Sequence, residues 1–250
     1  SGVDYFALDH DEGQFDGYLK RYGTFAGTGI TSFRMPSNLQ YIAPETFRNC
    51  EQLKTFYIGK AFRGKINYGE EGDPDTLFLY YAPIRLIQID KENTSYQLQN
   101  EILYTRDGHI LCQALKNDNA DSQLTIPSCV TEIADGAFYR NSEFGAIEVK
   151  GSLERIGISA FACADVGSFY VKGGVNYLDR GSFYQSAISE WRCHGGVKKY
   201  EKSAFQDVDA TNGYAIDMNA ITKLYQELLY VNATTDLSYW VKTIWNWIIM

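Results

Sequence analysis

Few residues in this 250-residue chain have types and spacings suited to acid–base or nucleophilic chemistry. The histidines His10, His109 and His194 are far apart, and no two share a helical turn as the ligands of a zinc-protease motif do. The stretch GISAF (157–161) lacks the second glycine of the serine hydrolase turn. The stretch GTFAGTG (23–29) lacks the lysine of a phosphate-binding loop. The sequence therefore predicts neither an enzyme nor a bound cofactor.

Acidic side chains gather in DHDEGQFDG (9–17), where Asp9, Asp11, Glu12 and Asp16 could offer oxygen ligands to calcium. Their order differs from that of an EF-hand loop, and no glutamate stands at the twelfth position counted from Asp9. We interpret this stretch as a solvated loop, with a calcium site as the alternative.

The five cysteines form no closely spaced pair of the kind that binds zinc or makes a redox disulfide. They are Cys50, Cys112, Cys129, Cys163 and Cys193. Their odd number favours buried free thiols, packed as small apolar side chains, over a disulfide framework. One disulfide remains as an alternative, and a metal site is disfavoured.

The net charge of -8 and the pI near 5.0 argue against a nucleic-acid partner, because phosphate contacts need clustered lysine and arginine. The one dense basic run, at Lys198, Lys199 and Lys202, is interpreted as a solvated edge. No run of 18 apolar residues is present, so we expect no transmembrane segment. We expect an extracellular or cell-surface location, although the chain, which starts at Ser1, contains no visible export signal.

The strands and turns that position these residues follow an internal repeat. Its template is an apolar residue, three intervening positions, a small residue and phenylalanine. The phenylalanines Phe138, Phe161, Phe183 and Phe205 follow one another at intervals of 23, 22 and 22 residues. Such a period predicts stacked units, because one unit of this length cannot bury its own apolar side. We expect the four rings to form a ladder inside the stack.

Before each phenylalanine, two apolar residues flank a single position, as in a short strand with one buried face. The pairs are Leu124 and Ile126, Ile147 and Val149, Phe169 and Val171, and Trp191 and Cys193. Two N-terminal units begin with the pairs Phe33 and Met35, and Phe56 and Ile58, which gives six units. Gly151, Gly174 and Gly196 stand just after the strands, where glycine marks turns because it permits a positive φ.

These phrases resemble the leucine-rich repeats of BspA-type bacterial surface proteins. The resemblance rests on FRMPSNLQYIAPETFRNCEQLKTFYIG (33–59), LTIPSCVTEIADGAF (124–138), SLERIGISAFACADV (152–166) and GGVNYLDRGSF (173–183). The stretch IRLIQIDKENTSYQLQNEILYTRDGHIL (84–111) is similar to the extended unit in which a hairpin with an Asp-Gly turn interrupts that family's repeats. The resemblance implies a right-handed α/β solenoid of short strands and turns, used for binding or adhesion and without chemistry of its own.

We expect one domain, with the solenoid over residues 1–216 and a helical cap over residues 217–250. Within the solenoid, residues 1–29 are expected to form an N-terminal cap and residues 59–122 a non-repeat insertion that contains the hairpin. At the C-terminal end, apolar residues recur at helical spacing in two stripes, the second after Asp236. These helices are expected to cover the end of the core, or alternatively to dock another chain.

If the strand pairs point inward, the residue between them must point outward. Across the units this predicts one exposed column of Arg34, Tyr57, Thr125, Glu148, Tyr170 and Arg192. Two positions further lie Lys150, Lys172 and His194. Tyrosine and arginine are enriched at binding hot spots, and an ordinary solvent face is the alternative. The ligand-binding candidates are therefore Arg34, Tyr57, Glu148, Tyr170, Lys172, Arg192 and His194.

The favoured function is non-catalytic recognition of a host or matrix protein by a secreted or surface-displayed module. A glycan-binding module is the alternative, because 19 tyrosines and 4 tryptophans could offer flat faces to sugar rings. An enzyme is least favoured, since no catalytic set of residues is recognisable.

Overall fold

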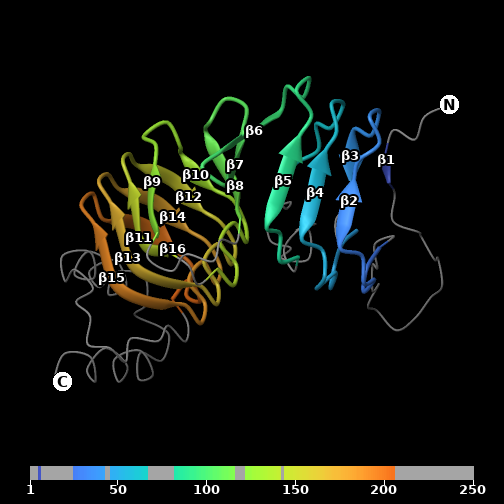
Figure 1. The fold of residues 1–250 in the computed structure, drawn as a ribbon. Helices are drawn as coiled ribbons and strands as arrows, with labels where there is room; N and C mark the ends of the chain where they lie inside the picture. Colours follow the sequence, from blue (N-terminus) through green and yellow to red (C-terminus); the bar gives the residue numbers. More distant parts are fainter. Residues whose placement is uncertain are drawn as a thin grey trace, which may run out of the picture.

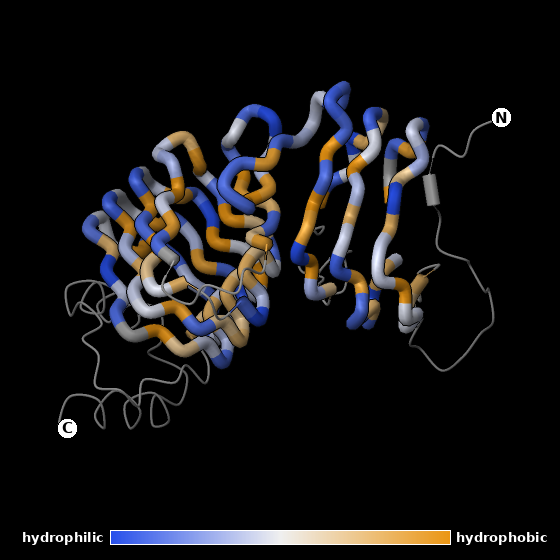
Figure 2. The backbone as a smooth tube through the Cα atoms, viewed as in Figure 1, coloured by the Kyte–Doolittle hydropathy of each residue, from blue (hydrophilic) through white to orange (hydrophobic). Residues whose placement is uncertain are grey.

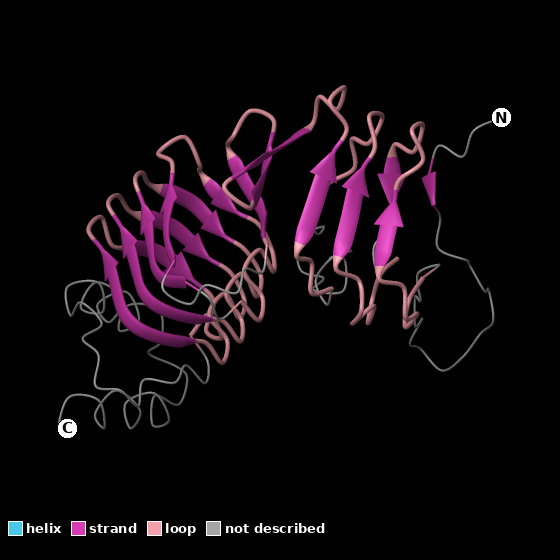
Figure 3. Ribbon diagram, in the orientation of Figure 1, coloured by secondary structure: helices cyan, strands magenta, loops and turns pink. Residues whose placement is uncertain are grey.

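The computed structural model describes residues 5–6, 25–42, 46–66, 82–115, 122–141 and 144–205. In these residues the chain winds into successive coils of short strands and turns (Figure 1). Strands β1 to β16 and their connections make up the described chain, which is therefore a β-solenoid (Figure 3). The helices expected at residues 217–250 and the acidic loop at residues 9–17 lie outside the described residues.

The N-terminal coils share a parallel three-stranded sheet in the order β2 (Ser32–Arg34), β4 (Thr55–Ile58) and β5 (Leu86–Ile89). A separate pair is formed by β1 (Tyr5–Phe6) and β3 (Tyr41–Ile42). Along β4 and β5, Phe56, Ile58 and Ile87 point inward and are buried. Strand β5 lies within the segment expected to be a non-repeat insertion, and it adds a further parallel strand to the repeat sheet.

In the C-terminal coils, the first strand of each coil belongs to a parallel front sheet. This sheet consists of β9 (Ser122–Ile126), β11 (Phe144–Val149), β13 (Asp165–Val171) and β15 (Ala187–Cys193). Its register aligns the predicted inward residues Leu124, Ile147, Phe169 and Trp191. These four side chains are buried, and so are their partners two positions on, which confirms the predicted strand pairs.

The second strand of each C-terminal coil belongs to a back sheet. These strands are β10 (Glu132–Ile133), β12 (Leu153–Ile156), β14 (Val175–Leu178) and β16 (Val197–Tyr200). The sequence pattern indicated a single strand before each phenylalanine and missed these second strands. Inward residues such as Leu153 and Ile156 are three positions apart, so the alternation that marks a strand is lost. Each of these coils thus has two sheets around one core.

The back sheet begins with an antiparallel meander of β6 (Tyr96–Gln99), β7 (Ile102–Thr105) and β8 (Ile110–Ala114). Between β6 and β7, Asn100 and Glu101 have positive φ values of 49° and 62°, as in the primed turns of tight hairpins. Between β7 and β8 the chain turns at Asp107 and Gly108, where the family resemblance implies an Asp-Gly hairpin. Strand β8 then pairs in parallel with β10, which joins the meander to the coils that follow.

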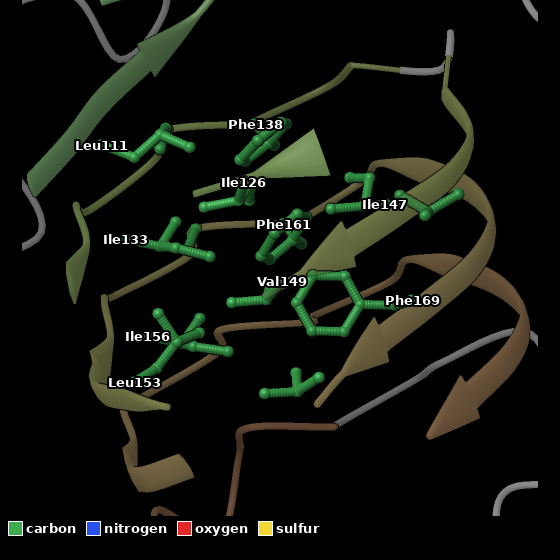
Figure 4. Packing of buried hydrophobic residues seen from close by; sticks show 14 of the residues in the cluster. Leu111, Ile126, Ile133, Phe138, Ile147, Val149, Leu153, Ile156, Phe161 and Phe169 are labelled. Carbon is green, nitrogen blue, oxygen red and sulfur yellow. The ribbon is translucent and has the colours of Figure 1, made fainter. Parts of the chain in front are cut away.

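The four repeat phenylalanines stack on one another, which confirms the predicted ladder. Figure 4 shows two of them, Phe138 and Phe161, among the buried side chains. Ring centroids are 4.6 Å apart for Phe138 and Phe161, 5.0 Å for Phe161 and Phe183, and 5.1 Å for Phe183 and Phe205. Phe169 of the front sheet meets Phe161 edge-on, at 5.0 Å between centroids. Figure 2 shows the resulting alternation of apolar and polar segments along each coil.

A buried amide joins the meander to the N-terminal coils. The Nδ2 of Asn93 donates to the carbonyl oxygens of Gly59 and Phe62, at 2.8 and 3.1 Å. Its Oδ1 accepts from the backbone N–H groups of Ser95 and Tyr96, both at 2.9 Å. Because a buried polar group without partners is costly, these four bonds fix the turn between β5 and β6 against the preceding coil.

Glycine is required where successive coils approach closely after the front strands. A Cβ at Gly195 would lie 2.6 Å from the backbone nitrogen of Gly174, and one at Gly151 would lie 2.8 Å from the carbonyl oxygen of Ser128. The positive φ that glycine permits is found at Gly196, at 70°, and not at Gly151 or Gly174. Gly151 is needed for its small size rather than for its conformational freedom.

Candidate binding surface

The outward face of the front sheet carries a column of side chains in register. Thr125, Glu148, Tyr170 and Arg192 are neighbours on β9, β11, β13 and β15. Thr125 and Arg192 are exposed, and Glu148 and Tyr170 are half-buried. They point outward because the residues on either side of each one are buried in the core.

Glu148 is the centre of a charge cluster on this face. Its carboxylate pairs with Lys150 on the same strand and with Lys172 of the next coil, where Nζ and Oε1 are 3.1 Å apart. Hydrogen bonds from Lys150 and then Lys172 lower the pKa of Glu148, and the bond to Glu148 raises the pKa of Lys172. Because both lysines are exposed and Glu148 is only half-buried, solvent screens these pairs, and the cluster shapes the surface charge more than it stabilises the fold.

Tyr170 and His194 form a second pair, from adjacent coils. The Tyr170 hydroxyl and the His194 Nε2 are 3.0 Å apart, and the two rings meet edge-on with centroids separated by 5.1 Å. Beside them, the guanidinium of Arg192 forms an ion pair with Glu190. A half-buried aromatic ring, an exposed imidazole and an exposed guanidinium thus stand together on one sheet.

Arg34 and Tyr57 lie on a different sheet from these residues. Register aligns them with Gln88 on the outward face of β2, β4 and β5, where the guanidinium carbon of Arg34 lies 3.9 Å from the ring centroid of Tyr57. The Tyr57 hydroxyl donates to Oδ2 of Asp90 at 2.8 Å, and this bond raises the pKa of Tyr57. The N–H of Glu92 and the Tyr57 hydroxyl together lower the pKa of Asp90.

The candidate residues therefore form two columns rather than the single column that was predicted. Among the described strands, none pairs with both β5 and β9, so the N-terminal column and the front-sheet column are not continuous. Gln88 completes the N-terminal column and was missed, because its strand falls within the segment expected to interrupt the repeats.

The largest cluster missed from the sequence lies on the back sheet. Arg155 donates to Glu132 at 2.8 Å and to Asp179 at 2.9 Å, and it also pairs with Asp135, a buried carboxylate. Burial opposes the charge of Arg155, but Asp135, Asp179 and Glu132 outweigh it and raise its pKa. Glu132, Arg155 and Tyr177 occupy equivalent register positions in successive coils. This repeat of polar residues is present in the sequence, but it can be recognised only once the second strand of each coil is known.

All five cysteines are free thiols. Cys50, Cys112 and Cys193 are buried, as predicted, and Cys193 aligns with the inward Val171. The prediction of burial is wrong for Cys129, which is exposed in the turn after β9, and Cys163 is of intermediate exposure. In the described part of the chain, no group of three or more histidine, cysteine or acidic side chains could hold a metal ion.

A family model described as the BspA type leucine rich repeat region matches residues 21–68 and 108–212 in six copies, more than half of the chain. No curated protein shows significant sequence similarity to the chain. Among the described residues, no helix has the length and apolar character needed to cross a bilayer.

Three solved structures are similar to this one. The pneumococcal vaccine antigen PcpA has a TM-score of 0.58 at 18% identity, with 73% of this chain and 50% of that chain covered. A leucine rich cell surface protein from Faecalibacterium prausnitzii A2-165 has a TM-score of 0.46 at 14% identity, with 78% of this chain and 63% of that chain covered. A leucine-rich repeat protein from Eubacterium ventriosum ATCC 27560 has a TM-score of 0.39 at 14% identity, with coverages of 74% and 66%. The chain thus spans about half the length of PcpA, and that likeness concerns the fold.

Proposed function

Because the chain belongs to the BspA type leucine-rich-repeat family, we propose that it is a non-catalytic binding or adhesion module, secreted or displayed at a bacterial surface. Its ligand is a host or matrix protein, bound by the outward face of the front sheet. The observation that supports this proposal is the registered column of Glu148, Tyr170 and Arg192, with Lys172 and His194 beside it.

This surface has the composition of a protein-binding hot spot. Tyrosine and arginine contribute both contact area and directional hydrogen bonds, and here they stand on strands whose inward residues are locked in the core. Ordering such side chains on binding costs little, because the backbone and the contact between Tyr170 and His194 are already in place. Both signs of charge are present, which suits a protein ligand with complementary polar groups.

The glycan alternative draws less support from the aromatic side chains. Sugar rings stack on open aromatic faces, yet the guanidinium of Arg34 lies over the ring of Tyr57, and Trp191 is buried in the core. Tyr57 is therefore better placed for edge contacts and hydrogen bonds than for stacking under a sugar.

The test is binding of the purified chain to a panel of immobilised matrix proteins beside a glycan array. We expect saturable binding to a protein, and we expect the double change Tyr170→Ala with His194→Ala to weaken it at least ~10-fold. Tyr177→Ala is the matched control, because Tyr177 is also a partly buried tyrosine hydrogen-bonded to the next coil, but on the back sheet.

Equal losses in the double variant and in the Tyr177 variant would show that the front face is not the site. Binding to glycans alone, reduced by the same double change, would keep the surface and replace the ligand class.

A further inference from the structure

The N-terminal sheet ends at a strand edge that no other described strand covers. Among the described strands, β5 pairs with β4 alone. On the β4 side, the N–H groups of Leu86 and Asp90 donate to backbone carbonyls of the β4 chain, at 3.0 and 2.9 Å. Because backbone groups alternate between the two sides of a strand, the N–H and C=O groups of Ile87 and Ile89 face the uncovered side.

A groove of about 710 Å³ lies at this edge. Its walls are β5, the turn after it, β6, Tyr57 of β4 and Arg106 of the meander. Figure 1 shows β6 leaving the end of β5 and running toward the back sheet, so that the two strands diverge. The volume is within the range of sites that accept a ligand. The edge of β5 that no described strand covers forms part of one wall, through Ile87 and Ile89.

Two exposed leucines stand on the strands that border this groove. Leu86 on β5 and Leu98 on β6 are the large apolar side chains that the described residues leave most open to solvent, at 45% and 40% exposure. Leu98 lines the groove itself. Within Leu86–Ile89 the pairing register is unbroken, and no charge or proline protects the edge in the way that natural sheets discourage strand addition.

The charges in the groove leave positive groups available. Lys91 and Arg106 line it, and neither forms an ion pair with another described residue. The one carboxylate in the lining, Asp90, is already engaged by the Tyr57 hydroxyl and the N–H of Glu92. A ligand with a carboxylate of its own would complement this arrangement.

We propose that the β5 edge binds an extended segment of a protein partner, which adds to the N-terminal sheet as a further strand. Main-chain hydrogen bonds to Ile87 and Ile89 supply the pairing. Apolar side chains of the segment pack on Leu86 and Leu98, and an acidic side chain lies opposite Lys91 and Arg106. This site is separate from the front-sheet surface, so the two can fail independently.

The probe is a fluorescent eight-residue peptide of alternating valine and threonine with one central glutamate, titrated against the full chain by anisotropy. A second peptide carries N-methyl groups on alternate backbone nitrogens, which removes the donors of one edge without changing the side chains. We expect saturable binding of the first peptide and at least ~10-fold weaker binding of the second. We also expect hydrogen exchange at the Ile87 and Ile89 amides to slow at least ~10-fold when the peptide saturates the chain.

Substitutions separate this site from the rest of the surface. Leu98→Ser and Arg106→Glu should each weaken the peptide ~5-fold or more, whereas Lys198→Glu, a charge reversal on the exposed back sheet, should leave binding within ~2-fold. The change of Tyr170 and His194 to alanine should have no effect on the peptide. Absence of saturable binding, equal binding of the methylated peptide, or Ile87 and Ile89 amides already protected in the free chain would each overturn the proposal.

Discussion

The rings of Phe161 and Phe183 lie 5.0 Å apart and within 3° of parallel, each contributed by the same position of successive coils. Both are fully buried, so Phe161→Ala should leave a cavity with ring faces on two sides and cost about 3–5 kcal/mol of unfolding free energy. Phe205→Ala should cost less than half as much, because Phe205 is only partly buried. Urea unfolding followed by tryptophan fluorescence measures both, and equal costs would contradict the ladder.

Removal of Arg155 should destabilise the back sheet through the charge that it leaves behind. Arg155→Ala leaves the buried Asp135 carboxylate without its cationic partner. The Oδ1 of Asp135 still accepts a hydrogen bond from the N–H of Ile158 at 2.8 Å. We expect a loss of about 2–3 kcal/mol, below the 3–5 kcal/mol of a fully buried pair because Arg155 is partly solvated. Adding Asp135→Asn to Arg155→Ala should recover part of that loss, and a further loss in the double variant would refute this electrostatic explanation.

The turn between β7 and β8 should weaken in acid. The Asp107 carboxylate accepts from the Thr105 hydroxyl at 2.6 Å and from the His109 N–H at 3.0 Å, and these bonds lower the pKa of Asp107. A lowered folded-state pKa gives stability that is complete above the ordinary carboxyl pKa, about 4, and is lost as the pH falls through the folded value. Wild type should therefore be more stable than Asp107→Asn at pH 7, with a difference that shrinks below about pH 4. A pH-independent difference in thermal unfolding would count against this role.

Thiol reactivity should follow burial. Cys129 is exposed and should react first with a thiol reagent in the native protein, and Cys163 should follow. Cys50, Cys112 and Cys193 are buried and should react only on denaturation. Cys129→Ser should abolish the fastest phase, and rapid reaction of all five groups in native buffer would show that the core is open.

The front sheet could be predicted because its signal is local. Residues such as Ile147 and Val149 alternate with an outward position, and the phenylalanines repeat at a nearly constant interval. Once that interval is known, register follows, and Tyr170 must lie beside Arg192 and within reach of His194. The candidate surface on the front sheet was therefore accessible from spacing alone.

The sheet arrangement of the N-terminal half could not be predicted to the same degree. A segment inserted between repeats leaves the spacing within the repeats unchanged, so the repeat pattern does not indicate where the inserted strands pair. Nothing in the spacing indicates that β5 continues the sheet of Arg34 and Tyr57 while the meander continues the back sheet. Two features follow from that branching: the division of the candidates into two columns, and a β5 edge that no other described strand covers. The cluster around Arg155 escaped for another reason, since its strand lacks the alternation that marks strands.

The close contact between Gly195 and the backbone at Gly174 has one more consequence. Backbone atoms of one coil touch backbone atoms of the next there, so the rise per coil is set by atoms that every residue possesses. Large neighbouring side chains therefore do not increase the separation of the coils. The distance between successive outward groups is thereby decoupled from their identity. Substitutions can therefore change the outward side chains of each coil while the spacing between those side chains stays the same.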